Sequence, residues 1–224
     1  MDMAPLFDPH DFWHNQPVPK IGEKIEDPSL LDTEIQTKTL DQVSQESLPL
    51  PPGYNWADLD MNSDAEIQEL YDLLTNNYVE DEDAYFRFDY SVAFLRWALC
   101  PPEGLKPWMV AVRGGKKNRL FGFIAGIPCT LGLNGIEKKV CEINFLCVNK
   151  HLRSKRLAPV LIQEITRRVN LTNTWQAVYT AGITIPTPIA NATYWHRSLN
   201  PKKLVETHFS PLPAGMPMSR YVKL

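Results

Sequence analysis

The sequence predicts an α/β protein built on a mixed sheet, and two patterns carry that prediction. The first is a strand–helix–strand succession: Val140–Val148 is apolar on both faces, Leu157–Val169 repeats apolar residues at helical spacing, and Trp175–Ala181 is a further apolar run. Such a succession is the right-handed crossover between two parallel strands. The second pattern is a series of shorter apolar runs before it, joined by turn residues, which is typical of antiparallel hairpins.

The chain is expected to begin with an arm, residues 1–47, followed by one globular domain, residues 48–224. The arm combines prolines with a polar run and shows no sustained period, whereas LPLPPG at residues 48–53 forms a stiff entry to the domain. Within the arm, Phe12 and Trp13 are adjacent large aromatic residues. They are expected either to lie over a ligand, with residues 12–19 partly ordered, or to latch the arm onto the domain.

Two helices are predicted near the start of the domain. Asp64–Tyr78 has apolar residues at helical spacing, and Ser63 with Glu66 three residues later is a capping box. Ser91 is expected to cap a shorter helix that ends before Pro101. Both apolar stripes are interpreted as core.

Four short strands are predicted next, in two hairpins. Trp108–Arg113 and Leu120–Ile127 are joined by a glycine-containing turn, and Thr130–Leu133 pairs with Glu137–Val140 through Asn134-Gly135. On Val140–Val148, Ile143, Phe145 and Cys147 are expected on one face, and Leu146 and Val148 on the other.

The last part of the chain is expected to form the short helix Pro201–Val205 and the strand Ser219–Leu224.

The acidic run Glu80–Asp83 has no spacing that suits a calcium loop, so no metal site is predicted. The run is interpreted either as a solvated loop or as an acidic lip that attracts a cationic group such as a peptide amine.

The chemistry is predicted at the junction between strand Val140–Val148 and helix Leu157–Val169. Basic side chains crowd there, just ahead of a helix N-terminus with its unpaired N–H groups: Lys150, His151, Arg153, Lys155 and Arg156. That combination can cradle phosphate groups, and it falls outside the carboxyl end of a strand, where open sheets bind ligands. A solvated basic loop is the alternative.

The composition excludes several classes of function. A net charge of −3 argues against bulk nucleic-acid binding, and no apolar run is long enough for a membrane span. The 4 cysteines include no CxxC pair and are interpreted as reduced residues of a cytoplasmic protein.

Four stretches are long and specific enough to compare with a known family. In order along the chain they closely resemble the eukaryotic glycylpeptide N-myristoyltransferases: FWHNQPVPKIGE (12–23), NNYVEDEDAYFRFDYS (76–91), EINFLCVNKHLRSKRLAPVLIQEITRRVN (142–170), and YTAG (179–182) through YWHRSLNPKKL (194–204). The resemblance implies the GNAT acyl-CoA N-acyltransferase fold, and only the first of the two GNAT-like halves of that family. It also implies protein N-myristoylation as the activity, with myristoyl-CoA as the acyl donor and no prosthetic group.

The resemblance implies a role for each matching residue. The backbone N–H groups of Phe145 and Leu146 would form an oxyanion hole, with Asn144 and Thr180 beside the reacting glycine. The acyl-CoA would be held by Phe12, Trp13, Cys147, Val148, Arg153, Ser154, Lys155, Arg156, Leu157 and Ala158. The peptide with its N-terminal glycine would contact Tyr78, Val79, Asp81, Phe86, Arg87, Phe88, Tyr90, Tyr194 and His196.

Two departures from the family bear on activity. Asn149 stands where members usually carry histidine, and the half that ends in the catalytic carboxylate is not matched by this chain. The chain is therefore expected to bind myristoyl-CoA, and to transfer myristate if it is complete or complemented by a second-half fragment. The alternatives are a non-catalytic acyl-CoA-binding half and a GNAT acetyltransferase that uses a short acyl-CoA. Without its second half the chain is expected to expose apolar surface and to self-associate or be unstable.

Overall fold

The computed structural model describes residues 18, 33–35, 38–80, 87–153, 155–182 and 188–222. The chain divides into two compact units, residues 1–187 and residues 188–224. Several predicted site residues lie outside the described residues: Phe12, Trp13, Asp81, Phe86 and Ser154.

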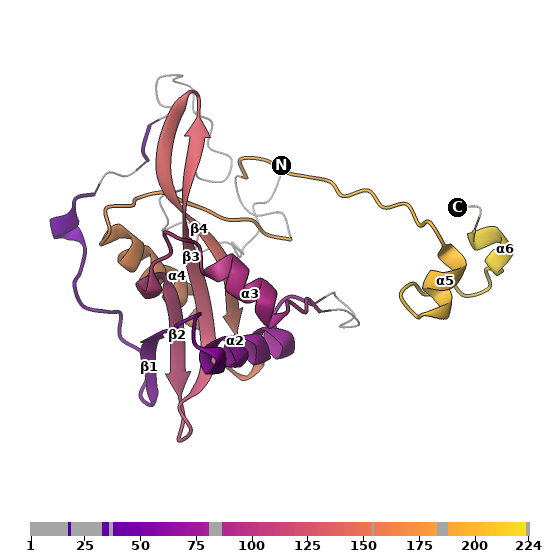
Figure 1. The fold of residues 1–224 in the computed structure, drawn as a ribbon, viewed down its shortest axis with the longest axis horizontal. Coiled ribbons are helices and arrows are strands. Elements are labelled where there is room, and N and C mark those ends of the chain that lie inside the picture. The colour runs from indigo at the N-terminus through magenta and orange to yellow at the C-terminus, as the bar shows by residue number, and fades with distance from the viewer. Residues whose placement is uncertain are drawn as a thin grey trace, which may run out of the picture. The chain divides into compact units, whose positions relative to one another are not determined.

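A five-stranded sheet of order β1-β2-β3-β4-β5 forms the centre of the first unit (Figure 1). Neighbouring strands from β1 to β4 pair antiparallel, whereas β5 runs parallel to β4. This arrangement confirms the predicted mixed α/β class and the parallel crossover. The strands are β1 (Tyr54–Asp58), β2 (Met109–Gly114), β3 (Arg119–Leu133), β4 (Ile136–Val148) and β5 (Ala177–Val178).

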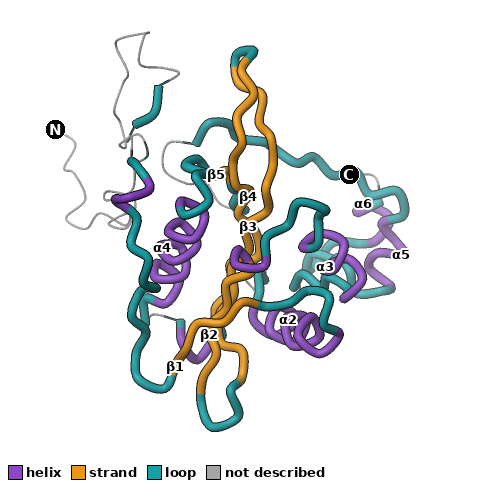
Figure 2. Tube along the Cα trace, turned by 60° about the vertical axis from the view of Figure 1, so that its left-hand side comes forward, coloured by secondary structure: helices purple, strands orange, loops and turns teal. Residues whose placement is uncertain are grey.

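Helices cover both faces of this sheet, as the tube in Figure 2 shows. On one face, α2 (Asp64–Asn77) and α3 (Val92–Leu99) bury Ile67, Leu70 and Leu95 against Phe123 of β3. On the other, α4 (Leu157–Asn170) buries Leu161 and Ile165 against Ile124 and Trp108. Among the described residues of this unit there are also three short 3-10 turns: η2 (Leu40–Gln42), η3 (Lys106–Trp108) and η4 (Lys150–Leu152).

Both predicted N-caps are present. The hydroxyl of Ser63 accepts a hydrogen bond from the N–H of Glu66, and that of Ser91 accepts one from Phe94. The reciprocal half of the Ser63 capping box is not formed, because the Glu66 carboxylate accepts from the N–H of Asp60 at 2.6 Å instead. Glu66 therefore ties the end of the preceding loop to the first turn of α2.

The strand predictions for the first unit need corrections. The predicted Glu137–Val140 and Val140–Val148 form one strand, β4. Leu120–Ile127 and Thr130–Leu133 belong to one strand, β3, which passes through Pro128 because the long hairpin with β4 continues on both sides of it. The predicted strand Trp175–Ala181 contracts to β5, whose two residues pair with Cys141 and Glu142. Strand β1 was not predicted.

The second unit carries two short helices, α5 (Pro201–Glu206) and α6 (Met218–Tyr221). The first confirms the predicted helix near Pro201, where Asn200 accepts a hydrogen bond from Lys203 as the N-cap. The predicted strand Ser219–Leu224 is wrong, because the N–H of Val222 bonds back to Met218 in a helical turn.

Candidate functional site

A β-bulge interrupts the pairing of β3 with β4 at Phe145. Ala125 pairs with Asn144 and Phe123 pairs with Cys147, so two residues of β4 stand opposite one residue of β3. Phe145 has a φ of 55°, in the left-handed region that a bulky aromatic residue rarely adopts. The bulge therefore turns the backbone of β4 out of the regular ladder at this point.

The bulge also changes which face each residue of β4 occupies. As predicted, Phe145 packs in the cluster under α2 and α3, and Leu146 and Val148 pack on the α4 side. The prediction for Ile143 is wrong, because it too lies on the α4 side. One extra residue between Ile143 and Phe145 reverses the two-residue alternation.

The sheet edge beside the bulge is open. The parallel pairing of β4 with β5 ends at Glu142 and Val178, so along the described residues Ile143–Val148 no strand pairs with this side of β4. Thr180 follows the end of β5 and is exposed, and the amide of Asn144 donates to the Glu142 carboxylate at 2.8 Å. The N–H groups near the bulge thus border a gap in the sheet.

Two tyrosines pack against the bulge. The ring of Tyr78 lies 6.1 Å from that of Phe145, and the ring of Tyr90 meets Phe145 edge-on at 5.5 Å. Burial raises the pKa of Tyr78 to about 12, although a backbone hydrogen bond from Phe145 acts in the opposite direction. Burial likewise raises the pKa of the Cys147 thiol to about 12, so both groups stay protonated at neutral pH.

The basic turn after β4 divides into two parts, and the inner part is already paired. The N–H of Lys150 donates to Asn77 at 2.9 Å, and its ammonium group contacts Glu80 at 3.0 Å. The guanidinium of Arg153 contacts the Asn77 carbonyl and lies 4.0 Å from Glu80. These side chains fasten the turn to the C-terminal end of α2.

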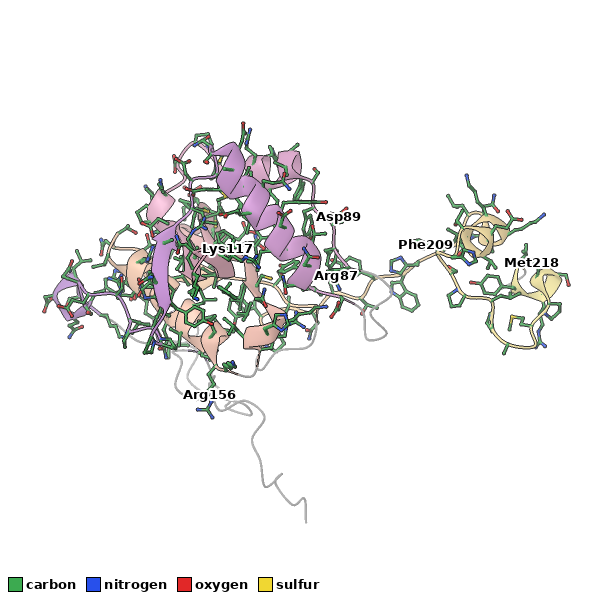
Figure 3. The ribbon with its side chains drawn as sticks, turned by 90° about the horizontal axis from the view of Figure 1, so that it is seen from below. Arg87, Asp89, Lys117, Arg156, Phe209 and Met218 are labelled. Carbon is green, nitrogen blue, oxygen red and sulfur yellow. The ribbon has the colours of Figure 1, made fainter. Side chains whose placement is uncertain are left out.

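The outer part of the turn presents free positive charge at the start of α4. Lys155 and Arg156 are exposed, and Arg156 projects from the surface of the first unit (Figure 3). Arg156 is the N-cap residue, with a φ of 58° and no side-chain capping bond. The first N–H groups of α4 are therefore left for another acceptor.

The carboxylate of Glu80 is paired with basic side chains and is not available to attract a cationic ligand as the predicted acidic lip would. Hydrogen bonds from Arg87 and Lys150 lower its pKa to about 2, and the contact with Arg153 adds further positive charge. The remaining acidic residues of this run, 81–83, lie outside the described residues. Nothing in the sequence pattern had indicated the pairing of Glu80 with Lys150, since 70 positions separate them.

The other predicted site residues are distributed between the two units. Val79, Arg87 and Phe88 are exposed near the end of α2, Leu157 is buried, and Ala158 is partly buried in the first turn of α4. Tyr194 and His196 are exposed residues of the second unit. Among the described residues, no group of three histidine, cysteine or acidic side chains is arranged to hold a metal ion, and no helix has the length and apolar character to cross a bilayer.

Comparison with known proteins now bears on this geometry. The family model described as the N-terminal domain of myristoyl-CoA:protein N-myristoyltransferase matches residues 34–192. The chain belongs to the N-myristoyltransferase family. This confirms the resemblance found in the sequence, including its restriction to the first half.

Individual family members show how far the similarity extends. A glycylpeptide N-tetradecanoyltransferase of Dictyostelium discoideum is 54% identical over 215 residues, and one of Arabidopsis thaliana is 53% identical over 216. A crystal structure of Saccharomyces cerevisiae N-myristoyltransferase with bound myristoyl-CoA superposes with a TM-score of 0.83 at 44% identity, covering 96% of this chain and 50% of that one. The chain thus has the GNAT-like fold of the family and spans about half the length of these relatives.

Proposed function

We propose that this chain binds myristoyl-CoA and forms the donor-binding half of an enzyme that transfers myristate to the N-terminal glycine of proteins. The bulge at Phe145 beside the open edge of β4 is the observation that carries the proposal. A thioester lying along that edge meets backbone N–H groups that are not committed to a neighbouring strand.

The N–H groups of Phe145 and Leu146 are the proposed oxyanion donors. Attack on a thioester places negative charge on the carbonyl oxygen, and one fixed donor there contributes roughly 10²–10³ in rate. Tyr78 and Tyr90 pack against the Phe145 ring and hold the bulge in place. The Phe145 N–H donates to the Tyr78 hydroxyl, so this bond has to give way when the N–H turns to the oxyanion. Asn144 and Thr180, on either side of the gap between β4 and β5, are proposed to orient the attacking glycine.

The turn Arg153–Ala158 is the proposed site for the CoA phosphates. Lys155 and Arg156 supply exposed charge, and the uncapped first turn of α4 supplies N–H groups. Arg153 is already held by Asn77 and Glu80, which favours a role in shaping the turn over direct phosphate contact. Cys147 and Val148, which precede the turn, would contact the donor from β4.

Transfer requires a base as well as donor binding. An α-amino group has a pKa near ~8, so its proton must be removed before attack. Around Phe145, the described groups Tyr78 and Cys147 both have a pKa of about 12 and cannot serve at neutral pH. We therefore propose that the glycine peptide is acylated only with a second-half polypeptide present.

We also propose a cytoplasmic location, in keeping with the free cysteines.

Calorimetric titration with myristoyl-CoA tests donor binding directly. We expect saturable binding, with acetyl-CoA bound more weakly because it lacks the long acyl chain. Replacing Lys155 and Arg156 together by alanine should weaken binding about tenfold. The matched control replaces Lys116 and Lys117, an equally exposed basic pair in the β2–β3 turn, and should leave affinity unchanged at the same net charge.

Three results would contradict the proposal: no saturable binding, equal affinity for both CoA esters, or equal loss in the two double variants. Equal affinity would favour an acetyltransferase instead.

A separate assay with a peptide that begins with glycine examines transfer. Turnover by the chain alone would exclude a non-catalytic acyl-CoA-binding protein, and turnover that appears only with a second-half polypeptide would establish a split enzyme.

A further inference from the structure

Asn77, the last residue of α2, is a buried polar residue to which the proposed chemistry gives no role. It is 8% exposed, and among the described residues Glu164 is the only other polar or charged residue that is buried. The amide nitrogen of Asn77 donates to the carbonyl of Leu73 at 2.8 Å, one turn back in the same helix. The amide oxygen is left to bond with another part of the chain.

That oxygen holds the turn between β4 and α4. It accepts the N–H of Lys150, the first residue of η4, at 2.9 Å. The first N–H groups of a helical turn have no partner inside the turn, so Asn77 supplies an acceptor that η4 itself lacks. The backbone carbonyl of Asn77 also accepts from the guanidinium of Arg153, which follows η4. One residue of α2 therefore binds both ends of η4.

The same end of α2 also holds the bulge. The ring of Tyr78, the next residue, lies 6.1 Å from that of Phe145, and the Tyr78 hydroxyl accepts the Phe145 N–H. A bound acyl-CoA would place its thioester at the bulge and its phosphates at the turn that leads into α4. Two consecutive residues thus fix the spacing between the two parts of the proposed donor site.

From these contacts, we propose that Asn77 is a positioning residue for the CoA phosphates. By holding η4 it fixes the place of Lys155 and of the uncapped first turn of α4, so the ligand has less of the turn to order. The N–H of Lys155 donates to the carbonyl of Leu152, the last residue of η4, at 3.3 Å, which links the two segments. The proposal rests on the proposed function, because it takes this turn as the phosphate site.

Calorimetric titration of Asn77→Ala with two donors tests the proposal. Myristoyl-CoA should bind about tenfold more weakly than to the unaltered chain, because the turn loses a hydrogen bond made away from water. S-myristoyl-pantetheine has the same thioester and acyl chain without the phosphates, and it should bind both proteins equally. A residue that only stabilised the fold would change both affinities alike.

Two controls show where Asn77 acts. Asn76→Ala is the matched control, since the exposed Asn76 donates at 2.7 Å to the carbonyl four residues back, as Asn77 does, but lies on the solvent side of α2. It should bind myristoyl-CoA like the unaltered chain. In a chain that already carries Lys155→Ala and Arg156→Ala, Asn77→Ala should weaken binding less than it does alone, because it acts through the same groups.

Several results would overturn the proposal: unchanged affinity of Asn77→Ala for myristoyl-CoA, equal loss for the two donors, or equal loss with Asn76→Ala. Asn77→Ser decides the matter if Asn77→Ala does not fold. A serine hydroxyl can still bond to the Leu73 carbonyl, but its oxygen lies one bond closer to the backbone than the Asn77 oxygen that holds Lys150. It should show the same selective loss, and equal affinities would again overturn the proposal.

The unaltered chain separates this proposal from the proposed function. If the unaltered chain binds no myristoyl-CoA, the proposed function is overturned. If the unaltered chain and Asn77→Ala bind it equally well, only the role of Asn77 is overturned.

Discussion

Glu164 is a fully buried carboxylate on α4, and its hydrogen bonds show how a charge is held away from water. Arg167 and Arg168 donate to it from the next turn, and the N–H of Leu48 donates at 3.1 Å. Burial raises the pKa of Glu164, but these hydrogen bonds outweigh burial and lower the pKa to about 2. Asp58 pairs with Arg168 and balances the remaining charge.

The lowered pKa predicts how stability depends on pH. A carboxylate with a depressed pKa in the folded state stabilises the protein above its unfolded pKa near 4.5, and this stabilisation is lost as the pH falls toward about 2. Glu164→Gln should lower the unfolding free energy at pH 7 by about 3 kcal/mol, because two arginines lose their buried partner. Its stability should also fall less between pH 4.5 and 2 than that of the unaltered chain.

Denaturant unfolding at several pH values checks this expectation. Glu80 also has a pKa of about 2, so both proteins lose its contribution over the same window and the difference between them isolates Glu164. Parallel pH curves for the two proteins would show that Glu164 does not titrate in that window.

At the scale of elements, the packing of β4 beside β3 depends on a glycine. A Cβ atom on Gly126 of β3 would lie 2.7 Å from the Cys141 sulfur of β4, closer than real Cβ atoms come, and 3.4 Å from Ile165 of α4, which is an ordinary contact. The Cys141 side chain can occupy its place only because Gly126 has no side chain. Gly132, on the same strand, has nothing within 4 Å of the corresponding point.

The two glycines form a matched pair for a stability measurement. Gly126→Ala should lower the unfolding free energy by about 1–3 kcal/mol through overpacking against Cys141. Gly132→Ala should change it by less than about 0.5 kcal/mol, since the added methyl group meets solvent. Thermal melts of the two variants decide the matter, and equal melting temperatures would contradict the packing argument.

The other end of α4 fastens the segment that leads into the sheet, Ser44–Leu50. Arg167 donates to the carbonyl of Ser44 at 3.1 Å and to the hydroxyl of Ser47 at 3.2 Å. Arg168, the next residue, instead contacts Asp58 and the carbonyl of Pro107, which belong to the body of the unit. Two similarly buried arginines therefore hold different parts of the chain: Arg167 holds the entering segment, and Arg168 holds the body of the unit.

Limited proteolysis distinguishes these attachments. Arg167→Gln should increase cleavage at residues 44–47 several-fold, because these residues lose their contacts with the guanidinium while Leu48 remains bonded to Glu164 and Trp56 and the apolar core stays intact. Arg168→Gln should destabilise the protein without favouring cleavage at that segment. Equal cleavage patterns for the two variants would refute the assignment.

The elements differ in how far sequence could predict them. The caps at Ser63 and Ser91 and the crossover through α4 depend on local side chains and periodicity, and all were predicted. The bulge at Phe145 was not predicted, because Asn144-Phe145-Leu146 contains no glycine and both faces of the strand are apolar from Val140 to Val148, so the pattern does not show where the register shifts. The contacts of Glu80 and Glu164 depend on partners distant in sequence.

At the scale of the whole molecule, the two units differ in how much they bury. The first has clusters of buried residues on both faces of its sheet. The second has no buried residue in α5 or α6, and it exposes Trp195 and Leu199 at 91% and 95%. Helices as short as these are marginal in water without tertiary packing.

This contrast predicts the pattern of amide hydrogen exchange in the isolated chain. Amides of α5 and α6 should exchange within seconds, because no packed core opposes their opening, whereas those of β2 and the central part of β3 should be protected up to the free energy of global unfolding. Mass spectrometry of the exchanged chain measures both regions together. Adding the second-half polypeptide should leave β2 unchanged, and any protection gained in residues 201–221 would show that this segment folds on binding. Slow exchange of α5 in the chain alone would contradict the expectation and imply that the second unit is already packed.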